Sequence, residues 1–248
     1  MDSAEYDNIA RLEGNHWYYR GKRILVRTWA NRFLPKSPNH PRLLDCGAGT
    51  GLFAEEAKSE FEVYVADDHE ESLHLLQNKF PPEKIIQIGP NGVEAPPDHF
   101  DVITALDVLE HIKEDQSAVK GIHNLLVPNG LFVATVPASM ILWSDWDESL
   151  HHYRRYSRKS LQDLFQDEWD VLHINYTNTV AFPAVWFLRK IRKLFPGLAR
   201  TGNRSEDHIP SRLLNNFLQE VFVRTGLSRI PFPFGVSLIV VARKRKVS

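Results

Sequence analysis

RLLDCGAGTG, residues 42–51, combines a short apolar strand that ends on an acid with three alternating glycines. The glycines are Gly47, Gly49 and Gly51, and Leu52 then begins a segment whose apolar residues have helical spacing. Glycine allows backbone angles and close approaches that a Cβ would prevent. A strand–turn–helix unit of this kind aims helix N-terminal amides into the crevice above a parallel sheet. The stretch therefore predicts a binding site for a nucleotide-like ligand.

The spacing of these glycines separates two classes of cofactor. They fall at every second residue, whereas the dinucleotide fingerprint has its third glycine one residue later. Residues 61–67, FEVYVAD, form a second predicted strand, which ends on Asp67. A carboxylate at the end of this strand can accept hydrogen bonds from both hydroxyls of a ribose. Such a residue serves NAD and S-adenosylmethionine (SAM) equally well.

Strand and helix patterns alternate along the rest of the chain, which favours a parallel sheet with helices on both faces. The later predicted strands are residues 84–88, a segment from residue 100 that runs into Leu109-Glu110-His111, and residues 131–137, 169–176 and 236–243.

With these motifs together, the chain resembles the class I SAM-dependent methyltransferases, in particular the branch whose fourth strand runs into a Leu-Glu-His segment. The resemblance covers about residues 42–176. It implies an α/β fold, with a seven-stranded, doubly wound, Rossmann-like sheet. It also implies that the last strand runs antiparallel between the fifth and the sixth, and that SAM is the cofactor.

The resemblance also assigns roles at the cofactor site. Asn91 stands close to where the family often has an acid, and its amide oxygen can still accept a hydrogen bond from the adenine amine. The residues implied to contact the cofactor are Asp45, Gly47, Ala48, Gly49 and Gly51 at the methionine part, Leu106 beside it, Asp67 and Asp68 at the ribose, and Asn91 at the adenine.

Length and composition fit a single domain over residues 1–248, which the resemblance implies is a SAM-dependent methyltransferase domain. The chain is 43% hydrophobic and 25% charged, with a formal net charge of −1. We therefore expect no nucleic-acid partner. The start shows no basic region followed by an apolar one, and no apolar run reaches the ~20 residues of a membrane span. A cytoplasmic protein is predicted. The single cysteine, Cys46, excludes an internal disulfide.

The N-terminal segment, residues 1–36, supports two interpretations. Its aromatic residues either pack a helix against the domain, as aromatic side chains usually do, or belong to a helical lid over the cofactor. In the lid interpretation Tyr19 shields the methyl donor and Arg23 meets a carboxylate. Related enzymes often carry such a cover, which supports the second interpretation.

The segment after the fifth strand, residues 138–156, is rich in aromatic, histidine and arginine residues. It follows the carboxyl edge of the sheet, beside the cofactor crevice. His151 and His152 are predicted catalytic residues, because an imidazole can take a proton from an acceptor near neutral pH. In the alternative interpretation Arg154 and Arg155 pair with nearby acids and only hold the loop in place.

His111 is a third predicted catalytic residue. A Glu-His pair at this place recurs in family members with unlike acceptors, which favours an organising role. A metal site formed by the acids and histidines of residues 145–152 matches no recognised ligand spacing. We therefore predict no metal.

A long insertion, residues 177–233, separates the last two predicted strands. Apolar residues between 184 and 198 follow helical spacing, and basic residues at 189–193 lie on the opposite face. Such a helix either packs on the domain with a solvated basic face or lies on an anionic membrane. We predict a helical cap, with a second helix near 209–222, and name the segment 184–200 as a candidate for peripheral membrane contact.

The predicted activity is methyl transfer from SAM to a small-molecule acceptor, including lipid- or sugar-linked biosynthetic intermediates. One alternative is a SAM-binding protein with non-methylating, cyclase-like or regulatory function. The other is an NAD(P)-dependent oxidoreductase, against which the glycine spacing argues. The Asn-Pro-Pro-Tyr segment of enzymes that methylate nucleic-acid amines is absent from the sequence.

Overall fold

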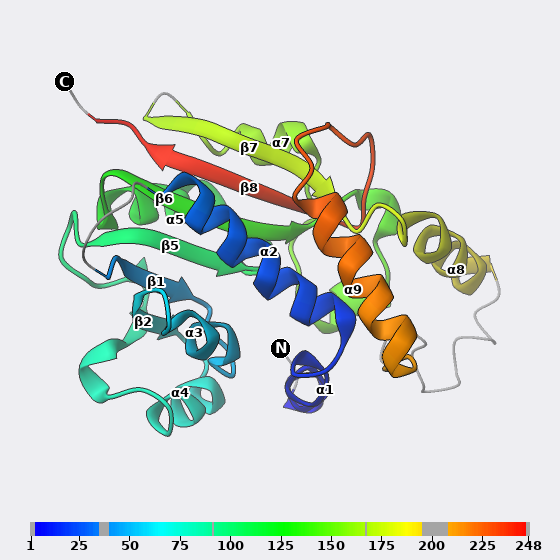
Figure 1. The fold of residues 1–248 in the computed structure, drawn as a ribbon, viewed down its shortest axis with the longest axis horizontal. Helices are drawn as coiled ribbons and strands as arrows, with labels where there is room; N and C mark the ends of the chain where they lie inside the picture. Colours follow the sequence, from blue (N-terminus) through cyan, green and yellow to red (C-terminus); the bar gives the residue numbers. More distant parts are fainter. Residues whose placement is uncertain (1–2, 35–39, 91, 167, 195–207, 247–248) are drawn as a thin grey trace.

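A mixed β-sheet forms the centre of the protein in the computed structural model, which describes residues 3–34, 40–90, 92–166, 168–194 and 208–246. Within these residues the sheet has eight strands in the order β4-β3-β2-β1-β5-β6-β8-β7 (Figure 1). The strands are β1 (Arg42–Cys46), β2 (Glu62–Asp67), β3 (Ile85–Gly89), β4 (Gly92–Val93), β5 (Phe100–Leu106), β6 (Leu126–Pro137), β7 (Trp169–Thr177) and β8 (Ser237–Lys244).

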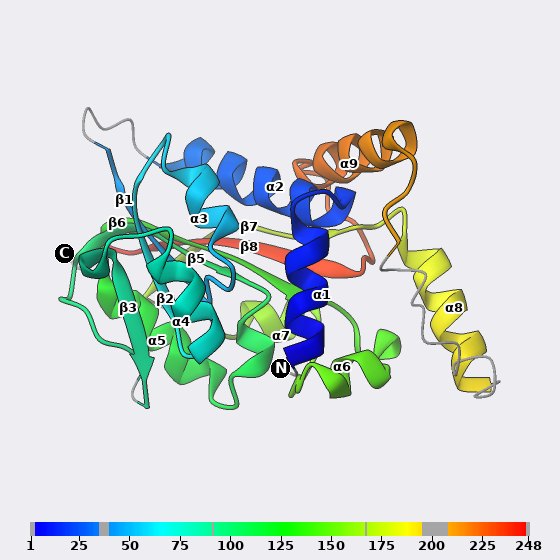
Figure 2. The same cartoon turned by 90° about the horizontal axis from the view of Figure 1, so that it is seen from below.

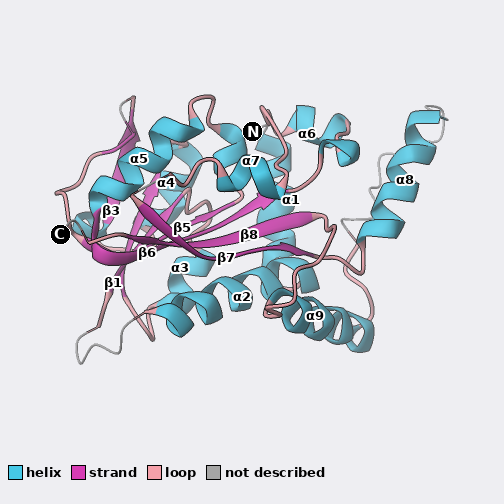
Figure 3. Cartoon of the chain, turned by 90° about the horizontal axis from the view of Figure 1, so that it is seen from above, coloured by secondary structure: helices cyan, strands magenta, loops and turns pink. Residues whose placement is uncertain are grey.

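Helices cover both faces of the sheet. The core on one face contains residues of α2, α3, α4 and α9, and the core on the other face contains residues of α5 and α7. Figure 3 shows α2 and α9 on one side of the sheet and α5 and α7 on the other. The helices are α1 (Ser3–Glu13), α2 (Trp17–Phe33), α3 (Leu52–Ala57), α4 (Glu70–Gln77), α5 (Asp115–Leu125), α6 (Asp145–Ser149), α7 (Arg158–Gln162), α8 (Phe182–Leu194) and α9 (Arg212–Gly226), with short 3-10 turns η1 (Pro82–Lys84), η2 (Leu109–His111) and η3 (Met140–Leu142).

The sheet topology confirms the predicted doubly wound fold. β1, β2, β3, β5 and β6 run parallel, and β8 is antiparallel to both β6 and β7. The predicted number of seven strands was one too few. The additional strand is β4, a two-residue strand that is antiparallel to β3 and pairs Ile88 with Val93. A strand this short leaves no periodic pattern in the sequence.

The central strands are buried on both faces because successive side chains point to opposite sides. Leu43 packs in the core on the α2 side and Leu44 in the core on the α5 side. Val102 and Ile103 of β5 divide in the same way, and all four side chains have no exposed surface. Each such burial stabilises the fold by roughly 1.5–3 kcal/mol.

The parallel strands end at one edge of the sheet, which positions the functional residues. The ends of β1, β2, β5 and β6 lie together there, and β8 starts there because it runs in the opposite direction. α1 crosses this edge between α2 and α6 (Figure 2). None of the helices in the described residues has the length and apolar character required to cross a bilayer.

The side of α8 that is buried differs from the prediction. α8 projects away from the sheet (Figure 1), and Phe187, Leu188 and Leu194 of its predicted packing face are 58%, 39% and 65% exposed. Arg189, predicted on the solvated basic face, is instead buried. The predicted second helix is α9, which packs against α2. The end of the predicted amphipathic segment, residues 195–200, lies outside the described residues.

A substitution at Gly51 tests whether the tight turn between β1 and α3 requires glycine. Its φ is +80°, and a Cβ would lie 2.8 Å from Cδ2 of Leu76. We expect Gly51→Ala to lower the free energy of unfolding by about 1–3 kcal/mol, because of the left-handed backbone and the contact. Gly121→Ala is the matched control, since its Cβ meets nothing within 4 Å on helix α5. Denaturant unfolding of both variants measures the difference, and equal stabilities would contradict the strain.

Candidate active site

A cavity of about 490 Å³ lies at the carboxyl edge of the sheet. Its size is within the range of about 300–1,000 Å³ that is usual for small-molecule sites. Within the described residues, it is lined by the start of α2, the glycine loop, η2, the segment after α6, helix α8 and the start of β8. The lining therefore combines residues from both ends of the chain.

The glycine loop leaves space that side chains would fill. Gly47 has φ +69°, and a Cβ there would lie 2.5 Å from a methyl group of Val108. Gly49 has φ +56°, lines the cavity, and has no atom within 4 Å of the Cβ it lacks. A ligand can therefore approach the backbone at Gly49, as the sequence predicted for the methionine part of SAM.

Asp45 lies at the base of this loop, at the end of β1. Its side chain is buried, lines the cavity and accepts a hydrogen bond from Oγ1 of Thr104 at 2.8 Å. Burial raises the pKa of Asp45 to about 7. Ala48, Leu106 and Tyr19, also predicted at the cofactor, line the same cavity.

The residues predicted at the ribose and adenine are not among the described residues that line the cavity. Asp67 is buried, and its carboxylate accepts hydrogen bonds from the backbone amides of Gly49 and His69, both at 2.9 Å. Asp67 therefore holds the glycine loop through the amide of Gly49. Asp68 is exposed, and neither acid belongs to the cavity lining in the described part of the chain. Gly51 is likewise outside that lining, and Asn91 is outside the described residues.

An ion pair that the sequence analysis missed joins the N-terminal segment to the sheet edge. Nζ of Lys22 lies 2.7 Å from Oδ2 of Asp107, whose Oδ1 accepts a hydrogen bond from Thr135 at 3.0 Å. Burial disfavours the charge on Asp107, but Lys22 and Thr135 hold the pKa of this carboxyl below its usual value. Asp107 also has φ +57°, a conformation that aspartate tolerates better than most residues.

Each interpretation of the N-terminal segment describes part of it. Leu25 and Trp29 of α2 are fully buried in the core. The first turn of the same helix places Trp17 and Tyr19 on the cavity. Arg23 contacts a carboxylate, that of Glu56, at 3.0 Å. The lid over residues 1–36 stays a prediction.

A second buried charge cluster surrounds Asp147 in α6. This carboxylate has no exposed surface, lies 3.0 Å from Nδ1 of His152 and accepts a hydrogen bond from Nε of Arg155 at 2.6 Å. Arg189 of α8 lies 3.6 Å away. Burial opposes the charge of Asp147, but the hydrogen bond with His152 and the charge of Arg155 lower its pKa to about 2. The Arg155 contact agrees with the predicted pairing of arginine and acid in this loop.

The three predicted catalytic histidines separate in the structure. His152 and His111 both line the cavity, with ring centroids 4.6 Å apart. His151 is exposed, has φ +57° and is not part of the cavity lining in the described residues. The backbone conformation at His151 therefore turns two adjacent imidazoles to different environments. The carboxylate of Glu110, which the sequence analysis gave no role, is fully buried beside the two cavity histidines.

Fold and cavity together are those of a class I SAM-dependent methyltransferase. A family model described as a methyltransferase domain matches residues 16–168, more than half of the chain, and the chain belongs to this family. From the family it follows that the chain is a methyltransferase and that SAM is its cofactor. The alternative of an NAD(P)-dependent oxidoreductase is therefore rejected. The space at Gly49 and the buried Asp45 fit this cofactor.

Relatives of known function are distant. The ubiquinone biosynthesis O-methyltransferase of Yersinia pestis (strain Pestoides F) is 29% identical over 109 residues, which cover 41% of this chain and 45% of the relative. The chain thus spans less than half the length of the curated relatives it matches.

Two solved structures show the same fold. Phosphoethanolamine N-methyltransferase 2 of Haemonchus contortus, in complex with SAM, is 18% identical, with a TM-score of 0.55 over 91% of this chain and 52% of that one. The cyclase SpnF is 15% identical, with a TM-score of 0.59 over 98% and 94% of the two chains. At these identities the likeness extends to the fold alone.

The Lys22–Asp107 pair makes a prediction about stability. Lys22→Met leaves the carboxylate without its buried partner, so we expect the free energy of unfolding to fall by about 3 kcal/mol. Lys159→Met is the control, because its ion pair with Asp163 is largely exposed, and we expect a change below about 1 kcal/mol. Denaturant unfolding at neutral pH measures both.

The same pair fixes the sign of a pH effect. Since the folded pKa of Asp107 is lowered, its contribution is present above the usual carboxyl pKa of about 3.9 and is lost as the pH falls through the folded value. The stability difference between wild type and Lys22→Met should therefore shrink in acid. A difference that grows in acid would contradict the pairing.

Proposed function

We propose that this enzyme transfers the methyl group of SAM to an oxygen of a small, partly apolar acceptor. The observation that carries the proposal is that one cavity joins the glycine loop to the imidazole of His152, whose orientation is set by Asp147. Trp17, Tyr18 and Trp146 supply an aromatic lining suited to such an acceptor. A distant relative that bears the name of an O-methyltransferase adds support.

Asp45 and the loop from Gly47 to Gly49 are proposed to hold the methionine part of the cofactor. Asp67 is proposed to bind the ribose. Its oxygens already accept hydrogen bonds from the amides of Gly49 and His69 and from the side chain of Ser72. An ionised carboxylate has about four acceptor positions, so about one remains for a ribose hydroxyl. SAM, when bound, supplies a methyl group on a positively charged sulfur.

The main task of the protein is then to orient the cofactor and the acceptor and to exclude water from the cavity. Good alignment of two reactants contributes about 7–11 kcal/mol to lowering a barrier. Tyr18 and Tyr19 stand over the cavity from α2, and Nζ of Lys22 lies 5.3 and 5.4 Å from their ring centroids. Lys22 is itself fixed by Asp107, so these rings are held on the cavity rather than left to rotate into solvent.

The acceptor oxygen must lose its proton to become a good nucleophile. His152 is proposed to promote this step. Asp147 is ionised and engages Nδ1 of His152, which leaves the lone pair of Nε2 for the cavity. A neutral imidazole nitrogen in this position can accept a proton or bind a cation. His111 lies beside it at the same end of the cavity.

We also propose peripheral membrane contact through α8. The exposed side chains of Phe187 and Leu188 provide apolar surface, and Lys190 on the same helix is exposed. This combination suits the headgroup region of an anionic bilayer. Arg189 does not contribute, because it is buried beside Asp147.

The acceptor class can be tested with matched compounds. We expect incubation with SAM and small hydroxylated aromatic molecules to yield S-adenosylhomocysteine and the O-methyl product, detected by mass spectrometry. The corresponding aromatic amines are the control, and we expect them to yield no more than background. Methylation of the amines in preference to the alcohols would contradict the proposal.

The role of His152 predicts a selective loss of rate. Since a positioned acid–base group contributes about 10²–10⁴-fold, His152→Ala should lower kcat by at least about 10²-fold while the affinity for SAM, measured by calorimetry, is unchanged. His151→Ala is the comparison, and we expect it to change kcat less than about threefold, because that side chain is outside the cavity lining of the described residues. Equal losses in the two variants would show that the loop, and not this imidazole, matters.

A further inference from the structure

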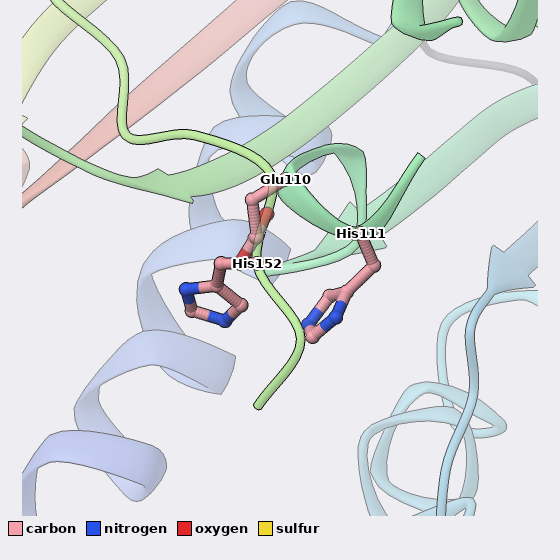
Figure 4. Close-up of side chains that lie close together, drawn as sticks. All are labelled: Glu110, His111 and His152. Carbon is pink, nitrogen blue, oxygen red and sulfur yellow. The ribbon is translucent and has the colours of Figure 1, made fainter. Parts of the chain in front are cut away.

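Three side chains with metal-binding atoms converge at the polar end of the cavity. Glu110 and His111 come from η2, and His152 comes from the segment after α6 (Figure 4). One donor atom from each lies within 4.8 Å of the other two. All three residues belong to the cavity lining.

Glu110 is the residue that ordinary packing does not explain. Its side chain has no exposed surface, and within the described chain neither carboxylate oxygen has a hydrogen-bond partner in another residue. A buried polar group in this state costs about 1–3 kcal/mol, and a charged one costs more. The charges of Lys22 and Arg155 favour the ionised form of Glu110 from a distance, but neither side chain bonds to it, because Lys22 is paired with Asp107 and Arg155 with Asp147.

Each imidazole of the group has one nitrogen already engaged. Nδ1 of His152 is held by Asp147 at 3.0 Å, and His111 makes a hydrogen bond with the backbone of Leu150. Histidines that bind metals usually have their second nitrogen held in this way by a carboxylate or a carbonyl. The second ring nitrogen of each histidine is then left for another ligand.

A purely structural role accounts for less of this arrangement. The two rings meet edge to face at an interplanar angle of 84°, which is a favourable aromatic contact in its own right. That contact does not account for the unpaired carboxylate beside them. A cation at this point accounts for all three groups, because it pairs with the carboxylate and takes a lone pair from each ring.

We propose that Glu110, His111 and His152 bind one divalent first-row transition-metal cation at the acceptor end of the cavity. Two imidazoles and one carboxylate form a set that Zn²⁺, Mn²⁺ or Co²⁺ accepts, with positions left open for water or substrate. Metal–ligand bonds of about 2.0–2.2 Å require the donor atoms to approach one another to about 3–3.5 Å. Binding would therefore draw the three side chains together.

This inference rests on the proposed function for its role in catalysis. An acceptor oxygen bound to the cation loses its proton to water more easily, because the cation stabilises the oxyanion. That oxygen then forms the new bond to the methyl carbon while the carbon–sulfur bond breaks and its electron pair stays on sulfur. In this state Nε2 of His152 is a metal ligand, and the cation promotes the loss of the proton.

Metal binding can be measured without SAM or acceptor. Full-length protein is stripped with a chelator and titrated with Zn²⁺ and with Mn²⁺ by calorimetry, and the Co²⁺ form is examined by visible absorption. We expect one cation per chain. Glu110→Gln and His111→Ala should each lower the affinity by more than about 100-fold and change the Co²⁺ spectrum. Asp147→Asn, which acts through His152, should lower the affinity by about 10–100-fold.

His74→Ala is the matched control, because this exposed histidine of α4 is outside the cavity lining of the described residues. It should bind the cation like wild type. Circular dichroism and SAM affinity establish that each variant is folded. If one of Glu110→Gln and His111→Ala does not fold, the other is sufficient for the test. The site is overturned if wild type binds no cation, or if Glu110→Gln and His111→Ala bind it as tightly as wild type does. Cation binding without O-methylation retains the site and refutes only the proposed function.

Discussion

The parallel strands of this protein all end at the same edge of one sheet, and the functional geometry depends on that constraint. Asp45 is the last residue but one of β1, and β5 is followed two residues later by η2 with its Leu-Glu-His sequence. Hydrogen-bonded registry between β1 and β5 pairs Cys46 with Ala105, so the two chain segments leave the sheet at the same level. A catalytic group after one strand thus meets a ligand held after its neighbour without any special long-range contact.

Buried ion pairs attach the additional segments to this edge. Lys22 brings the start of α2 to Asp107, and Arg189 brings α8 towards Asp147. Such pairs contribute little net stability once desolvation is counted, but they disfavour arrangements in which the charges are separated. Their effect here is to define which faces of α2 and α8 line the cavity.

Sequence was informative where the signal is local. The glycine loop, the strand pattern and the Leu-Glu-His segment were sufficient for the fold, whereas the position of β8 depended on resemblance to a family. Signals between distant residues were not available. The apolar spacing of α8 suggested a packed face, but Arg189 is buried because it meets Asp147, a residue far away in the sequence. Nothing local distinguishes His151 from His152, since the backbone angle at His151 and the partner of His152 decide which ring faces the cavity.

α2 serves the core and the cavity at once, and this has a consequence for where the domain can be shortened. Removing the chain up to β1 would take Leu25, Trp29 and the rest of α2 off the sheet and leave Asp107 without Lys22, so the remainder would expose a large apolar surface. Leu12 of α1 is buried as well, so the boundary that preserves the buried apolar residues lies before Leu12 and not at His16, the N-cap of α2.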